Sequence, residues 1–236
     1  MTVSVQEADQ TAAGERYEYI DAAFIPGGGK LHLIRQGDFY SIQFADDELM
    51  GSHVRHSEQA LATLTCERLG RGDGRVLIGG LGMGFTLGAA LAAWGPKAEI
   101  VVAELVPEVV TWARGPLAHI FGDSLTDPRV ALEVADVHDV IVRAPGSFDA
   151  ILLDVDNGPD GLVQLANERL YCDWGLRASY AALRAGGVLA IWSAYSDADF
   201  VLRLERAGFA VEEITIAAEE YNDNVNHTIW LAAKPA

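Results

Sequence analysis

The stretch Arg75-Val-Leu-Ile-Gly-Gly-Leu-Gly-Met-Gly-Phe-Thr-Leu87 joins a short apolar run to a cluster of glycines. The apolar run predicts a buried parallel strand that breaks into a turn. Glycine adopts backbone angles closed to other residues and lets a ligand lie against the main chain. A helix predicted to begin near Met83 points its first amides at this turn, where an anionic or polar part of a ligand is stabilised. The glycines of the turn are Gly79, Gly80, Gly82 and Gly84.

The spacing of these glycines separates two kinds of nucleotide site. A dinucleotide fingerprint needs G-x-G-x-x-G, and counting from Gly80 and Gly82 its third position is Phe85. The pattern G-x-G-x-G fits with Gly84 as the third glycine, and this spacing resembles the first motif of S-adenosylmethionine (SAM) dependent transferases. A nicotinamide-dependent dehydrogenase is the weaker alternative. A tight turn without any ligand is another, because a glycine-rich turn alone is weak evidence.

Composition and charge narrow the classes of partner. The 236 residues allow one substantial domain with a small appendage, and 50% of them are hydrophobic, so a large core is available. The formal net charge is −17. Such an acidic surface repels a phosphate backbone, so we expect no nucleic-acid partner. The charge favours a cationic substrate, or it serves solubility alone.

The sequence carries no signal for membranes or metals. It has no apolar run long enough to span a bilayer and no charged-then-apolar start, so we expect a cytoplasmic protein with no membrane partner. Cys66 and Cys172 form no CxxC pair, and the six histidines form no evident ligand cluster. This predicts reduced thiols and no metal site.

The chain divides into a tail and two structured parts. Residues 1–14 are small and polar, which predicts a flexible tail. Residues 15–52 alternate apolar and polar side chains between glycine-rich turns, which predicts a small N-terminal β-hairpin domain. In residues 53–236 strands alternate with helices, which predicts an α/β Rossmann-like sheet, mostly parallel and covered on both sides. The last two apolar stretches predict an antiparallel final pair, which suits a SAM-methyltransferase fold better than a dehydrogenase.

One acidic residue ends the strand predicted at residues 99–104, and another follows the strand predicted at residues 130–134. Glu104 can accept two hydrogen bonds from a ribose diol, as acids do at strand ends in nucleotide sites. It can also stabilise the N-terminus of the helix that follows. Asp136 can accept a hydrogen bond from an adenine amino group, or it can cap the short helix after it. We therefore take both as candidates for binding a nucleoside.

The strand predicted at residues 148–154 leads into Asp154 and Asp156. We expect it to lie beside the first strand, so that its end faces the same crevice as the glycine turn. A carboxylate beside a sulfonium centre can orient an incoming amine and accept its proton. We assign this chemistry to Asp154, with Asp156 as a second catalytic candidate. One of them can instead cap the following turn, and a metal is disfavoured because no third ligand has suitable spacing.

Five segments together resemble the spermidine synthase family, and the resemblance covers nearly the whole chain. Family members join an N-terminal β domain to a SAM-type sheet. They move an aminopropyl group from decarboxylated SAM to putrescine or a similar amine. The resemblance implies a SAM-type co-substrate and a small-molecule amine as the acceptor. The segments are residues 76–84, residues 127–130 with Asp136, residues 148–154, Gly158 with Pro159, and residues 183–189.

The resemblance also implies roles for single residues. Glu104 matches the acid that binds ribose, Asp136 the acid that binds adenine, and Asp154 the aspartate that deprotonates the amine. Glu58 is the retained glutamate of the family's tyrosine-histidine-glutamate stretch, here His56-Ser57-Glu58, and is a candidate for substrate binding. Asn157 replaces a second family aspartate and is another such candidate.

Two departures from the family concern the donor. Gly82 stands where the family has an aspartate that holds the donor's ammonium group and repels a carboxylate. A family glutamine falls at about Met50. Without the aspartate, the main electrostatic reason to prefer decarboxylated SAM is gone. Full SAM would then be tolerated, with its carboxylate near the amides of the helix after Gly84.

We therefore expect a transferase that uses SAM or decarboxylated SAM and moves a methyl, aminopropyl or aminocarboxypropyl group to a small amine. A protein that binds a nucleoside without catalysis is the alternative. Tyr195 is a candidate member of an aromatic wall for an alkyl amine or cation, although core packing explains each ring alone. The other aromatic candidates are Tyr171, Trp174 and Trp192. The apolar β-hairpin domain makes a homodimer the expected assembly.

Overall fold

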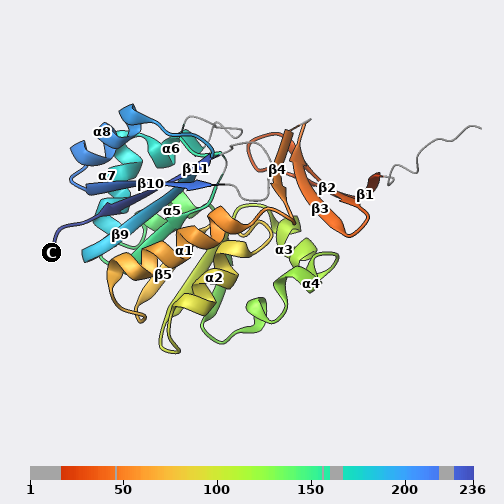
Figure 1. The fold of residues 1–236 in the computed structure, drawn as a ribbon, viewed down its shortest axis with the longest axis horizontal. Helices are drawn as coiled ribbons and strands as arrows, with labels where there is room; N and C mark the ends of the chain where they lie inside the picture. The colour runs from red at the N-terminus through yellow and green to blue at the C-terminus, as the bar shows by residue number, and fades with distance from the viewer. Residues whose placement is uncertain (1–16, 46, 156, 160–166, 218–225) are drawn as a thin grey trace, which may run out of the picture.

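The computed structural model describes residues 17–45, 47–155, 157–159, 167–217 and 226–236. A small sheet stands beside a larger body of sheet and helices (Figure 1). The tail predicted over residues 1–14 lies outside the described residues. Within the described part of the chain, no helix is long and apolar enough to cross a membrane.

The small sheet is built from the predicted hairpins. Its four strands are antiparallel in the order β1-β2-β3-β4. Alternate side chains of β2 and β3 are buried, and they join one apolar cluster with residues of the larger domain. The period of two therefore turns one face of the small sheet towards the large one. The strands are β1 Tyr17–Phe24, β2 Lys30–Gln36, β3 Phe39–Phe44 and β4 Asp47–Gly51.

The large sheet has seven strands in the order β10-β11-β9-β8-β5-β6-β7. Only β11 runs against its neighbours, so the predicted mostly parallel sheet with an antiparallel final pair is confirmed. The strands at its centre are mostly apolar and almost fully buried, as is typical of strands covered on both faces. The strands are β5 Arg75–Gly79, β6 Glu99–Glu104, β7 Val130–Val134, β8 Phe148–Leu153, β9 Leu183–Ser193, β10 Ala210–Ala217 and β11 Asn226–Ala233.

Helices cover both faces of this sheet and separate two apolar clusters. Helices α1, α2 and α3 contribute to the cluster that also holds the small sheet, whereas α5, α7 and α8 contribute to the other. Trp112 of α3 donates its indole N–H to Asp21 of β1 at 2.8 Å, which ties the small sheet to this helix. The helices are α1 His56–Leu69, α2 Phe85–Ala93, α3 Pro107–Arg114, α4 Ala118–Phe121, α5 Val137–Val142, α6 Glu168–Tyr171, α7 Asp173–Ala182 and α8 Ala198–Arg206.

The sheet order places a crevice at the carboxyl end of β5. From β5 the chain proceeds through β6 and β7 on one side, then returns to β8 and β9 on the other. Ligands of open α/β sheets bind where the strand order reverses in this way. Helix α2 begins at Phe85, two residues later than predicted, because Gly84 is left-handed with φ +79° and cannot join the helix.

Candidate active site

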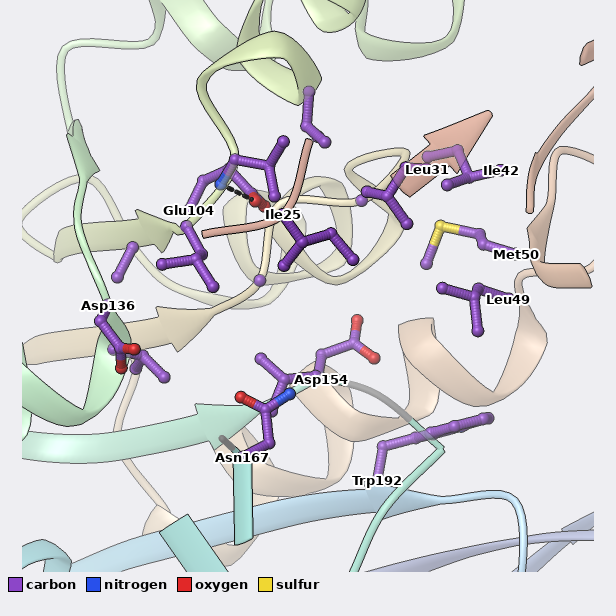
Figure 2. Close-up of a pocket in the computed structure, with 18 of the residues that line it drawn as sticks. Ile25, Leu31, Ile42, Leu49, Met50, Glu104, Asp136, Asp154, Asn167 and Trp192 are labelled. Atoms are coloured by element: carbon purple, nitrogen blue, oxygen red, sulfur yellow. Dashed lines mark hydrogen bonds between the residues drawn. The ribbon is translucent and has the colours of Figure 1, made fainter. Parts of the chain in front are cut away.

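A single cavity lies at this reversal point, between the ends of the parallel strands and the small sheet (Figure 2). Its volume is about 190 Å³, more than ten times the roughly 10–15 Å³ that one water needs, so it is no packing void. Polar side chains occupy the strand ends, and apolar ones come from the small sheet. The described lining residues are Ile25, Leu31, Ile42, Leu49, Met50, Glu58, Gly80, Gly82, Ala103, Glu104, Leu105, Val106, Val109, Asp136, Val137, Asp154, Val155, Asn167 and Trp192.

The glycine turn forms the floor of the cavity. Gly80 has φ +89°, and a Cβ there would lie 2.3 Å from the backbone oxygen of Asp154. The absence of a side chain therefore lets the ends of β5 and β8 meet. Gly82, with φ +48°, also lines the cavity. Gly84 does not line it and instead makes the turn into α2, where a Cβ would overlap the Phe121 ring at 2.3 Å.

Glu104 ends β6 with its carboxylate buried beside the glycine turn. One oxygen accepts the backbone N–H of Leu81 and the other that of Val106, each at 2.8 Å. Burial raises the pKa of Glu104, and the backbone hydrogen bonds oppose that rise. Val106 caps α3, so the alternative role at a helix start is present in the structure. The backbone N–H groups of Leu105 and Gly82 also stabilise the ionised form. A carboxylate has about four lone-pair sites, so a ribose diol bound here would share them with these backbone groups.

Asp136 follows β7 at the far end of the cavity. One carboxylate oxygen accepts the backbone N–H of His138 at 2.9 Å and so caps α5. The other oxygen forms an ion pair with Arg169 of α6. Both the capping role and the position on the cavity wall, which an adenine contact requires, are therefore present.

Asp154 lies across the cavity from Glu104 and Asp136 (Figure 2). It accepts the hydroxyl hydrogen of Thr86, in the first turn of α2, at 2.6 Å. Burial raises the pKa of Asp154 to about 6, and the Thr86 hydrogen bond opposes the rise. A carboxyl group with this pKa is mostly ionised at neutral pH and titrates near it, as a general base should.

Glu58 of α1 also reaches the cavity and belongs to a buried chain of polar groups. Ser57 donates its hydroxyl hydrogen to Glu58 Oε2 at 2.8 Å, and the same hydroxyl lies 2.9 Å from Nδ1 of His227 on β11. Since a hydroxyl has one hydrogen, His227 Nδ1 must be the donor to Ser57. His227 also packs against Trp192 of the cavity wall, with ring centroids 4.9 Å apart.

Two other candidates are not among the described residues that line the cavity, and a third lies outside the described residues. Asn157 uses its backbone oxygen to accept from Ala194 N at 3.2 Å, and it is not among the described lining residues. Tyr195 is 59% exposed and also does not line the cavity, because the chain turns outward after β9. Its assignment to substrate binding is therefore not supported by position. Asp156 lies outside the described residues.

The proposed aromatic wall is reduced to Trp192. Tyr171 is buried in the core, where its hydroxyl donates to the backbone oxygen of Val155 at 3.0 Å. Trp174 is exposed and packs against His138, with ring centroids 4.8 Å apart. Tyr171 therefore follows the alternative of core packing, whereas Trp174 lies neither in the core nor among the described lining residues.

The sequence did not reveal the part of the cavity wall formed by the small sheet, nor the hydrogen bond from Thr86 to Asp154. The alternation of apolar and polar residues places Leu31 and Ile42 on the inner face of the small sheet. This pattern could have identified them as residues of the cavity wall. In the sequence, Met50 stands out only as a departure from the family, and Thr86 does not stand out at all. Nothing in the sequence pattern says that these side chains reach the turn and Asp154, because both contacts join elements distant in the chain.

One group of side chains has metal-like spacing, although the sequence suggested no histidine cluster. Among the described residues, Asp136, His138 and Asp139 place ligand atoms within 4.8 Å of one another. The contacts already present account for this group. Asp136 is used by the α5 cap and by Arg169, and His138 Nδ1 lies 3.3 Å from Asp139.

Solved structures of other proteins have a fold similar to that of this chain. No family model and no curated protein matches the chain. A spermidine synthase from Thermotoga maritima matches 97% of this chain and 83% of its own, at 16% identity and a TM-score of 0.71. A spermidine synthase in complex with the transition-state analogue AdoDATO matches 97% of this chain and 84% of its own, at 17% identity and a TM-score of 0.73.

A methyltransferase also has a similar structure. The 1,6-didemethyltoxoflavin-N1-methyltransferase of Burkholderia thailandensis, with bound 1,6-didemethyltoxoflavin and S-adenosylhomocysteine, matches 77% of this chain and 80% of its own, at 20% identity and a TM-score of 0.54. At these identities the likeness establishes the fold. The chain has a spermidine synthase-like fold of the class I SAM transferase type, as the sequence resemblance predicted.

Proposed function

We propose that the protein is a transferase that moves an alkyl group from the sulfonium of SAM or decarboxylated SAM to a small amine. One juxtaposition carries the proposal. The glycine turn, Glu104, Asp136 and Asp154 line a single cavity at the carboxyl ends of four adjacent parallel strands. The spermidine synthase-like fold agrees with it.

The order of the strands suggests how the donor lies. Strands β7, β6, β5 and β8 are neighbours in that order, so Asp136, Glu104, the glycine turn and Asp154 follow one another along the crevice. With adenine at Asp136 and ribose at Glu104, the sulfonium lies over the glycine turn. The carbon to be transferred then faces Asp154.

The proposed reaction is an in-line displacement. The amine nitrogen forms a bond to a sulfonium-bound carbon, and the electrons of the broken C–S bond return to sulfur. The nitrogen gives up a proton, which Asp154 accepts in its ionised form. Thr86 holds this carboxylate in place through the 2.6 Å hydrogen bond. Catalysis comes mainly from positioning the two reactants together.

Two observations narrow the reactants. The neutral Gly82 gives no reason to reject a donor carboxylate, so we favour full SAM as donor. Methyl and aminocarboxypropyl transfer then become the preferred reactions. The net charge of −17 and the carboxyl groups of Glu58 and Asp154 in the cavity favour a cationic amine as acceptor.

The test is turnover with SAM or decarboxylated SAM over a panel of small amines, followed by mass spectrometry. Methyl transfer leaves S-adenosylhomocysteine, whereas the other two transfers leave 5′-methylthioadenosine. We expect an alkylated amine with one of these nucleosides in equal amount, and neither product with Asp154→Asn. Nucleoside binding without turnover across the panel would favour the non-catalytic alternative. Absence of binding would overturn the proposal.

A further inference from the structure

Met50 reaches from the small sheet to the glycine turn and fills the space above Gly82. A Cβ on Gly82 would lie 2.8 Å from Met50 Cε and 2.9 Å from its Sδ. The backbone N–H of Met83 donates to the same sulfur at 3.1 Å. Figure 2 shows the Met50 side chain on the cavity wall, with Leu31, Ile42 and Leu49 from the same sheet nearby.

We propose that Met50 determines donor specificity and selects SAM, whose tail ends in a carboxylate and an ammonium, over decarboxylated SAM, whose tail has the ammonium alone. The inference rests on the proposed function, because it takes the nucleoside to lie against Glu104 and Asp136. It adds a residue outside the glycine turn that decides which tail is accepted.

The position of the tail follows from the order of the strands. A nucleoside held at the ends of β7 and β6 directs its sulfur substituents towards β5 and β8. There the tail meets the turn at Gly82, with Met50 above it and Asp154 to one side. The group next to the α-carbon of Gly82 is thus an uncharged thioether.

A tail that ends in an ammonium gains little from Met50, and Asp154 to one side attracts the ammonium that both donors carry. A thioether is a weak acceptor and carries no charge, so it cannot pair with a cation as a carboxylate would. A carboxylate side chain at position 82 has no room while Met50 keeps its place. Gly82 and Met50 therefore pack against each other. A larger residue at position 82 requires a different side chain or conformation at position 50.

A tail that ends in a carboxylate gains more. The Met83 N–H has only a weak sulfur acceptor. A carboxylate oxygen makes a charge-assisted hydrogen bond roughly twice as strong as a neutral one. Met50 has three rotatable side-chain bonds and can withdraw at small cost. The donor's carboxylate can therefore take over the Met83 N–H, which an ammonium cannot do because it accepts no hydrogen bond.

The first test compares two substitutions of similar volume by calorimetry with SAM, decarboxylated SAM and 5′-methylthioadenosine. For the unchanged protein we expect SAM to bind about tenfold or more tightly than decarboxylated SAM. Met50→Leu keeps the apolar volume but removes the sulfur acceptor, so the preference for SAM should persist. Met50→Gln offers the Met83 N–H a stronger neutral acceptor that competes with the donor's carboxylate, so the preference should fall several-fold. Equal preference in the two variants would overturn the proposal.

The second test restores a charge above the turn. In a Met50→Ala background, Gly82→Asp and Gly82→Asn differ only in charge, and both residues tolerate the left-handed backbone found there. We expect the aspartate variant to bind decarboxylated SAM about tenfold more tightly than the asparagine variant does, and SAM more weakly. The same ratio of affinities in both variants would show that the donor's tail does not lie over Gly82, and it would overturn the proposal.

5′-Methylthioadenosine separates the two levels of inference, because it has the nucleoside and lacks the charged tail. We expect it to bind the unchanged protein, Met50→Leu and Met50→Gln alike, and to bind the two Gly82 variants equally to each other. If it binds and the donor preferences do not change, the role of Met50 is wrong and the proposed function stands. If it does not bind the unchanged protein, both fail.

Discussion

Asp154 combines two properties that oppose each other, since its carboxyl group is buried and yet must be ionised to accept a proton. Burial raises its pKa from 3.8 to about 6. A raised folded-state pKa of an acid means that ionisation destabilises the fold. This contribution to stability is therefore fully present below about pH 4 and is lost as the pH rises through about 6. The proposed catalytic form is the less stable one.

Replacing Asp154 should expose this trade-off. Asn keeps the shape and an acceptor for Thr86 but cannot ionise, so Asp154→Asn should be about 2–3 kcal/mol more stable than the unchanged protein at pH 8. The two should differ little near pH 4, and the variant should be inactive. Urea unfolding at both pH values measures this. Equal or lower stability of the variant at pH 8 would show that the carboxyl group is not held in a costly site.

Thr86 should set the pH range of activity. Its hydroxyl lowers the pKa of Asp154 by stabilising the carboxylate. Thr86→Val keeps the shape without the donor, so the pKa should rise and the alkaline-rising limb of the rate profile should move to higher pH. Thr111→Val, which removes an exposed hydroxyl on α3, is the matched control and should leave the profile unchanged. If the two variants have the same pH–rate profile, then either Asp154 is not the general base or Thr86 does not control its pKa.

Glu104 should matter to both folding and nucleoside binding. The two oxygens of Glu104 accept the backbone N–H groups of Leu81 and Val106. In Glu104→Gln, an NH₂ group replaces one of these oxygens, so one backbone N–H loses its acceptor. We expect a loss of about 1–3 kcal/mol in the free energy of unfolding and weaker binding of 5′-methylthioadenosine. Glu99→Gln, at the exposed start of the same strand, should change neither. Binding that survives in Glu104→Gln would argue against the ribose contact.

The sequence placed the polar residues of the strand ends more reliably than their neighbours. Glu104, Asp136 and Asp154 follow strands whose apolar runs are plain, and parallel strands end at one edge of a sheet. Tyr195 also follows a strand, but its ring points to solvent. Nearness to a strand end does not determine side-chain direction, which depends on the path of the chain afterwards.

At the scale of elements, the glycine turn holds β5 against β8 and starts α2. Gly80→Ala would push a Cβ to 2.3 Å from the Asp154 backbone oxygen at a backbone φ of +89°. We expect several kcal/mol of destabilisation and loss of nucleoside binding. Gly88→Ala lies in the interior of α2 with open space around it. It should stabilise the protein by about 0.4–1 kcal/mol. The midpoint of thermal unfolding should therefore fall in Gly80→Ala and rise in Gly88→Ala, although both variants add one methyl group.

Elements with strong periodicity were predictable, and contacts between distant elements were not. The parallel core, the antiparallel β11 and the hairpins of the small sheet follow from apolar runs and alternation. The placement of Met50 over Gly82 depends on how β4 packs on the turn, which no local pattern encodes. The sequence predicts the start of α2 too early, because the left-handed conformation of Gly84 becomes evident only in the fold.

At the scale of the molecule, the small sheet uses its two faces differently. The inner face covers the cavity with apolar side chains. The outer face exposes large aromatic side chains. Tyr17 and Phe39 flank Gln36 across neighbouring strands, and Tyr19 lies next along β1. Exposed apolar patches of this kind often mark protein interfaces.

The expected homodimer should therefore form through this outer face. Light scattering should give about twice the chain mass of 25.3 kDa. Tyr19→Glu combined with Phe39→Glu should lower it to one chain while leaving nucleoside binding intact, because both side chains point away from the cavity. Replacing an exposed residue far from this sheet, as in Leu202→Glu on α8, should leave the mass unchanged. A single-chain mass for the unchanged protein would contradict the expectation.

The most direct measurement is a crystal structure of the protein with 5′-methylthioadenosine. The two ribose hydroxyls should lie within hydrogen-bond distance of the Glu104 carboxylate, with adenine near Asp136 and the sulfur over the turn between Gly80 and Gly82. That result would support the donor site on which the proposed transfer depends. A nucleoside bound elsewhere, or one in this cavity that does not touch Glu104, would contradict it.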